Sequence, residues 1–129
     1  MQKGRWEHTQ HQADIGVRGI GPTPDEAFAQ AAMALTAVIT NPRGVVPSEP
    51  LEVECQASDL ETLLVDWLNR IVLEMAVKKM LFSRFDVCIM SERLRARIWG
   101  ETVDLNRHHP AVEVKAATYH GLAGRQQPN

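Results

Sequence analysis

Long apolar runs are missing from this sequence, and so are the cysteines that staple small secreted proteins. No apolar run is more than a few residues long, so no segment is predicted to span a bilayer. Residues 1–14 lack the apolar core of a secretory signal peptide. Cys55 and Cys88 are too few for a disulfide scaffold and lack the spacing of a metal motif. These absences predict a cytoplasmic protein, away from the membrane, with both thiols reduced.

The sequence also lacks the positive excess that autonomous nucleic-acid binders carry. Lys and Arg number 14 against 16 Asp and Glu, for a formal net charge of −2. Because phosphate neutralisation supplies most of the affinity for nucleic acid, unaided RNA binding is not expected. No nucleophile elbow, phosphate-binding loop or dinucleotide fingerprint is present. The composition favours a protein that acts on another protein, a small molecule or a metal.

What is present is the pattern of one ordinary domain spanning residues 1–129. The chain is 44% hydrophobic and 23% charged, close to the globular average. Hydrophobic periodicity predicts a strand, a helix, a strand, a helix and then three strands, over residues 14–21, 24–39, 51–57, about 60–78, 81–90, 93–99 and 111–122. Residues 41–50 and 104–111 are predicted to be loops. The order indicates an α+β fold, a single two-layer domain with a mostly antiparallel sheet and two helices packed on one face.

Both helices carry start signals and an apolar stripe. Thr23 is the expected N-cap of the first, with Pro24 at N1 and Glu26 completing a capping box. Ser58 and Glu61 repeat that box before the second helix. The apolar stripe expected on the second helix consists of Leu60, Leu64, Trp67, Leu68, Ile71 and Met75. This stripe is predicted to pack on the sheet.

The strands alternate, which predicts one buried and one exposed face. The faces expected to be buried carry Leu51, Val53 and Cys55; Leu81, Phe85, Val87 and Ile89; and Leu94, Ala96 and Ile98. Cys88 is expected to be more exposed than Cys55. The opposite face of residues 93–99 carries Arg93, Arg95 and Arg97, which form either a solvated face or a surface for RNA phosphate or an acidic partner.

Few residues suggest chemistry by themselves. Asp14 opens a strand close to His11, and an acid there either ligates a divalent cation or satisfies local backbone donors. The five histidines, His8, His11, His108, His109 and His120, lack zinc-ligand spacing and are mostly expected to be solvated. A hydrolytic zinc site would require the fold to gather them. Lys115 falls on the outward face of the last predicted strand, where a lysine is ordinarily exposed.

Taken together and in order, five segments resemble the archease family. They are HQADIGVRGIGPTPDEAFAQAAMALTAVIT, SDLETLLVDWLNRIV, LFSRFDV, LRARIWGETVD and AVEVKAATYHGL, and the resemblance covers residues 6–122. It implies a small α+β accessory protein, not an enzyme, that activates an RtcB-type RNA-splicing ligase in tRNA processing. In that family, the protein helps to transfer GMP from GTP, which the ligase uses, onto a ligase histidine and so permits multiple turnover. The resemblance implies that RNA is contacted only through the ligase.

The resemblance also implies roles for three residues. Asp14 matches the acid of the family's H-T-A-D-I-G motif, the expected ligand of a Ca²⁺, Mg²⁺ or Mn²⁺ ion, and His11 matches its histidine. Lys115 matches the lysine of the V-K-A-x-T-Y segment and is expected to contact the nucleotide or the ligase.

The sequence departs from the family pattern in two places. Gln12 replaces the motif's usual threonine. The family has a final strand with an Asp that completes the metal site, and neither is expected in this chain, which ends GLAGRQQPN. Losing that carboxylate would weaken the binding of a hard cation. Two alternatives remain: a small metal-dependent hydrolase using His11, Asp14 and His120, and a chaperone-like scaffold protein.

Overall fold

The computed structural model describes residues 4–11 and 14–110, and for residues 8–11 and 14–18 it describes the backbone alone. The elements, in order, are β1 (Arg5–His11), β2 (Asp14–Ile20), α1 (Pro24–Ile39), the short 3-10 helix η1 (Pro42–Gly44), β3 (Glu49–Gln56), α2 (Leu60–Lys78), β4 (Met80–Met90), β5 (Arg93–Thr102) and α3 (Leu105–His108). None of the described helices is long and apolar enough to cross a membrane.

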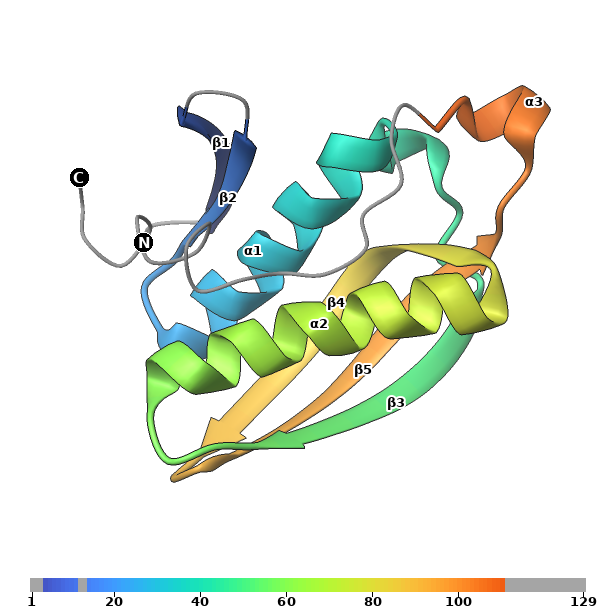
Figure 1. The fold of residues 1–129 in the computed structure, drawn as a ribbon. Helices are drawn as coiled ribbons and strands as arrows, with labels where there is room; N and C mark the ends of the chain where they lie inside the picture. The colour runs from blue at the N-terminus through green and yellow to red at the C-terminus, as the bar shows by residue number, and fades with distance from the viewer. Residues whose placement is uncertain (1–3, 12–13, 111–129) are drawn as a thin grey trace.

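The described strands form two antiparallel sheets, which confirms the predicted α+β class. β1 pairs with β2 in a hairpin, and the other sheet has the order β3-β5-β4. Figure 1 shows α2 lying across one face of the three-stranded sheet, with α1 between β4 and the hairpin. The β1 strand was not predicted, because only its partner β2 shows a recognisable pattern.

One core joins both helices to a single face of the three-stranded sheet. Trp67 is fully buried, donates its indole N–H to the carbonyl of Phe28 at 2.9 Å, and meets Phe85 edge-on with ring centroids 6.2 Å apart. The sheet contributes Val53, Phe82, Leu94, Ala96 and Ile98. The predicted alternation of β3 and β5 is therefore confirmed, and Arg93, Arg95 and Arg97 lie on the exposed opposite face.

Side chains of helix α1 form hydrogen bonds with main-chain groups along the edge of β4. The Asp25 carboxylate accepts a hydrogen bond from the backbone N–H of Ile89 at 3.1 Å, and the Thr36 hydroxyl donates to the carbonyl of Phe82 at 2.6 Å. On its other flank α1 approaches β2 so closely that a Cβ at Gly19 would overlap the backbone of Ala27. A covered edge cannot recruit further strands, so α1 closes the β4 side of the sheet and holds the hairpin beside it.

The start of α1 is as predicted, but that of α2 is not. The Thr23 hydroxyl accepts from the N–H of Glu26 at 3.2 Å, as an N-cap does. The N-cap of α2 is Asp59, not Ser58, and its carboxylate accepts from the N–H of Thr62 at 2.7 Å. Adjacent Ser and Asp are both good caps, so the pattern alone left a one-residue ambiguity. Leu60, predicted to belong to the buried stripe of α2, is 48% exposed.

A β-bulge in β4 overturns the predicted face of Leu81. The pairing with β5 shifts between Phe82 and Arg84, so Phe82 joins the main core together with Phe85, three residues later. Leu81 instead packs in a small second cluster with Ile39 and Val45. Strict alternation cannot anticipate an extra residue in a strand.

The loop predicted over residues 104–111 contains the helix α3, and His108 in it is buried rather than solvated. The strand predicted over residues 111–122 lies outside the described residues.

Candidate functional site

The expected metal ligand Asp14 is the first residue of β2, and its Cα partner across the hairpin is His11, the last residue of β1. The fold therefore brings the backbones of these two positions together at one end of the hairpin. Gly19, near the other end of β2, lets that part of the strand lie against α1.

The donor set in the described part of the chain is small. No group of three or more His, Cys, Asp or Glu side chains that could hold a metal occurs among the described residues. Ca²⁺ takes six to eight oxygen ligands, and Mg²⁺ keeps several waters. A cation held at Asp14 would complete its coordination with further oxygen ligands or water. Lys115 and His120, the other predicted site residues, lie outside the described residues.

A second polar cluster, missed from the sequence, surrounds the carboxylate of Glu101. Its Oε1 meets Arg107 Nη2 at 2.6 Å, and its Oε2 accepts from the backbone N–H of Val46 at 2.7 Å and lies 2.9 Å from His108 Nε2. The guanidinium of Arg107, followed by the Val46 and His108 hydrogen bonds, lowers the pKa of Glu101 to about 2. The same partnership raises the pKa of Arg107.

The tautomer of His108 follows from its two ring contacts. Nδ1 accepts a hydrogen bond from the backbone N–H of Asp104 at 2.8 Å, so the ring proton sits on Nε2 and is donated to Glu101. The His108 carbonyl accepts from the Thr40 hydroxyl. With both ring nitrogens occupied and the side chain fully buried, His108 joins α1, β5 and α3 structurally and is not placed to ligate a metal.

The only sequence signal for this cluster was an acid at the end of an alternating strand followed by paired histidines. Because adjacent histidines in a polar stretch ordinarily face solvent, nothing local indicated that His108 is buried and His109 exposed.

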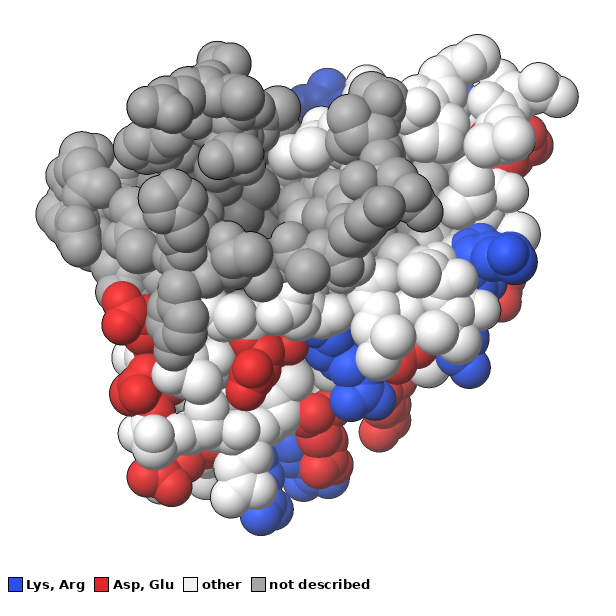
Figure 2. Space-filling model, viewed as in Figure 1, with Lys and Arg blue, Asp and Glu red and all other residues white. Residues whose placement is uncertain are grey.

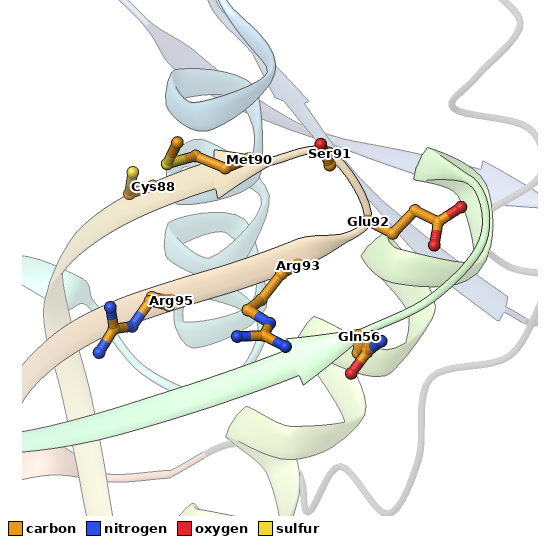
Figure 3. Close-up of a pocket in the computed structure, with 7 residues that line it drawn as sticks. All are labelled: Gln56, Cys88, Met90, Ser91, Glu92, Arg93 and Arg95. Atoms are coloured by element: carbon orange, nitrogen blue, oxygen red, sulfur yellow. The ribbon is translucent and has the colours of Figure 1, made fainter.

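The exposed face of the three-stranded sheet is polar and cross-linked by ion pairs. Arg97 contacts Glu52 at 2.7 Å and Arg95 contacts Glu54 at 3.5 Å, while the Arg84 guanidinium lies 4.4 Å from the centre of the Trp99 ring. At the turn between β4 and β5 this face is hollowed, and Figure 3 shows the side chains of the hollow, which are Gln56, Cys88, Met90, Ser91, Glu92, Arg93 and Arg95. The predicted arginine stripe is therefore exposed, and two of its three members are already paired with carboxylates.

The two cysteines differ in environment as predicted. Cys55 is half-buried, and burial raises the pKa of its thiol, so its reactive thiolate form is disfavoured. Cys88 is exposed beside the hollow.

Comparison with known proteins gives one consistent result. The Archease protein family (MTH1598/TM1083) matches residues 6–129. Protein archease of Pyrococcus abyssi is 40% identical over 129 residues, covering 97% of this chain and 91% of that relative. Protein archease of Sulfurisphaera tokodaii is 41% identical over 124 residues, covering 95% and 88%.

Solved structures agree with this result. The solution structure of Methanobacterium thermoautotrophicum protein 1598 superposes with a TM-score of 0.78 at 31% identity, covering 89% of this chain and 84% of that one. The crystal structure of an archease, possible chaperone, from Thermotoga maritima superposes with a TM-score of 0.53 at 23% identity, covering 87% and 80%, and shows the shared fold.

Proposed function

Because this chain belongs to the archease family, we propose that it is a cytoplasmic accessory protein that promotes guanylylation and multiple turnover of an RtcB-type RNA-splicing ligase. The observation that carries the proposal is the family match over residues 6–129, together with Asp14 standing opposite His11 at the end of the β1–β2 hairpin.

In this proposal Asp14 anchors a divalent cation and His11 lies beside it. A hard cation such as Ca²⁺, Mg²⁺ or Mn²⁺ suits a carboxylate, and when bound it would supply positive charge near the nucleotide phosphates. Lys115 would contact the nucleotide or the ligase. The contribution of the described fold is to pair β1 with β2, which sets His11 opposite Asp14, and to pack the other end of β2 on α1 at Gly19.

The charge distribution supports RNA contact through the ligase rather than directly. Figure 2 shows Lys and Arg interspersed with Asp and Glu over the described part of one face, without a continuous basic surface. On the exposed face of the three-stranded sheet, Arg97 and Arg95 of β5 stand across from Glu52 and Glu54. Carboxylates beside Arg95 and Arg97 would repel a phosphate backbone.

The test is guanylylation of an RtcB-type ligase with GTP and a divalent ion, with and without this protein. We expect stimulation by the wild type, little or none by Asp14→Ala, and wild-type stimulation by Asp66→Ala, which removes an exposed carboxylate from α2. Because Asp14 starts a strand away from the α2 core, the Asp14 variant should remain folded. An Asp14→Ala variant that stimulates fully and responds to added metal like the wild type would refute the metal role.

Two other functions predict different results. The Thermotoga maritima protein is called a possible chaperone, and α2 of this chain exposes Leu73 and Val77 by 52% and 64%. A chaperone-like scaffold would suppress aggregation of a client without GTP or metal and leave guanylylation unchanged. A metal-dependent hydrolase using His11, Asp14 and His120 would cleave phosphoesters on its own.

A further inference from the structure

Strand β3 is an edge of the three-stranded sheet. Among the described strands it pairs only with β5, whereas the opposite edge, β4, is covered by α1. An open edge presents unpaired N–H and C=O groups that can hydrogen-bond another strand.

The main-chain groups that point outward from β3 can be identified from the pairing with β5. The N–H of Ala57 donates to the carbonyl of Glu92 at 3.0 Å, so positions 57 and 92 form a hydrogen-bonded pair. Along an antiparallel ladder, hydrogen-bonded pairs alternate with non-hydrogen-bonded pairs, whose N–H and C=O groups point away from the partner strand. The N–H and C=O groups of Glu52, Glu54 and Gln56 therefore face away from β5, toward the open edge.

The side chains along this edge alternate in charge and polarity. Glu52 and Glu54 stand on the exposed face, with side chains 71% and 62% exposed. Leu51 and Cys55 are half-buried on the core face, on either side of the buried Val53. The ion pairs to β5 use the Oε2 atom of each glutamate, and a carboxylate can accept from a second basic group through its other oxygen.

The structure already contains a strand that β3 accepts. Its partner β5 places basic residues on the same exposed face as Glu52 and Glu54, and apolar residues on the core face. The residues of β5 alternate in the order Arg93, Leu94, Arg95, Ala96, Arg97 and Ile98. A strand added on the other side of β3 would meet the same two glutamates and the same apolar positions, so the same alternation suits it.

A second copy of β3 does not suit this edge. In an antiparallel β3–β3 pair centred on Val53, each Glu52 stands opposite Glu54 of the other copy, and in a pair centred on Glu54 the two Glu54 side chains face each other. Like charges directly opposite destabilise a strand pair, and Pro50 near the start of the strand provides no N–H.

We propose that the β3 edge binds an extended segment of a partner protein in which basic and apolar residues alternate, by adding it as a fourth strand. Main-chain hydrogen bonds to positions 52, 54 and 56 provide affinity, and the two glutamates select the basic residues. This proposal does not depend on the ligase or on a metal at Asp14.

The probe is a fluorescein-labelled, end-capped peptide of sequence RLRARIW, identical to residues 93–99. Its binding is measured by fluorescence anisotropy against the full chain. Three comparisons accompany it: the same peptide N-methylated at alternate residues, a peptide with Glu in place of each Arg, and the protein variant E52K/E54K with D66K on α2 as its control.

We expect saturable binding of RLRARIW, at least about tenfold weaker binding of the N-methylated and acidic peptides, and a similar loss for E52K/E54K but not for D66K. Equal binding of the N-methylated peptide would mean charge attraction without strand pairing and would overturn the proposal. Absence of binding at millimolar peptide would do the same.

Sedimentation velocity of the unliganded protein tests the alternative occupant. A concentration-dependent dimer that E52K/E54K alters would assign the edge to a second copy and overturn the proposal. The N-methylated peptide uses the wild-type protein, so the test stands even if the double variant folds poorly.

Discussion

Replacing Thr36 by Val isolates the hydrogen bond by which α1 covers the edge of β4. Thr36 is fully buried and its hydroxyl donates to the carbonyl of Phe82 at 2.6 Å. Valine has nearly the same shape, so no cavity forms and the change is confined to the hydroxyl. The variant leaves the Phe82 carbonyl buried without this donor.

The expected cost follows from two opposing terms. An unsatisfied buried carbonyl costs about 1–3 kcal/mol, and the added methyl returns up to about 0.8 kcal/mol of apolar burial. We therefore expect Thr36→Val to lower the free energy of unfolding by about 1–2 kcal/mol. For a chain of this size that corresponds to a fall in Tm of about 3–10 °C.

The assay is urea unfolding followed by circular dichroism, with Thr102→Val as the matched control. Thr102 lies exposed near the end of β5, so its replacement should change the stability by less than about 0.5 kcal/mol. The denaturant slope should be unchanged in both variants, because the surface exposed on unfolding is the same. Equal stability of Thr36→Val and the wild type would show that the Thr36 hydroxyl does not stabilise the contact between α1 and the edge of β4.

Three further predictions concern the core, the Glu101 cluster and the exposed face. Leu68→Ala, at a fully buried site, should lower the free energy of unfolding by about 2–5 kcal/mol. Leu73→Ala, at a 52% exposed site on the same helix, should lower it by less than about 0.5 kcal/mol. Similar losses in both variants would mean that α2 is rotated about its axis. Since the pKa of Glu101 falls from 4.5 to about 2 on folding, its stabilising effect is complete above about pH 5 and is lost as the pH falls toward 2. The stability gap between wild type and Glu101→Gln should narrow over that range, and a gap independent of pH would contradict the assignment. Arg93→Glu, on the exposed face of β5, should change stability by no more than about 0.5 kcal/mol in thermal unfolding, and a collapse would show that this face is buried.

Local patterns in the sequence determined the two long helices, α1 and α2, and the faces of β3 and β5. Helix α1 runs from Pro24 to Ile39, the predicted bounds, because its N-cap Thr23, its proline and its apolar spacing are all local to this segment. The burial of Leu94, Ala96 and Ile98 against the exposed arginines likewise needs only the two-residue period of a strand. Asp14 was also predicted to open a strand near His11, and the backbone confirms that much.

Tertiary structure decided the features that depend on partners distant in sequence. Capping of the β4 edge joins Thr36 to Phe82, and burial of His108 depends on Glu101 and on Thr40 in α1. The bulge in β4 moves Leu81 out of the main core, although nothing in its own segment indicates an extra residue. The periodicity of a segment indicates which of its faces is apolar. The hydrogen-bond partner of a buried polar atom, by contrast, comes from another element and is determined only when the elements pack together.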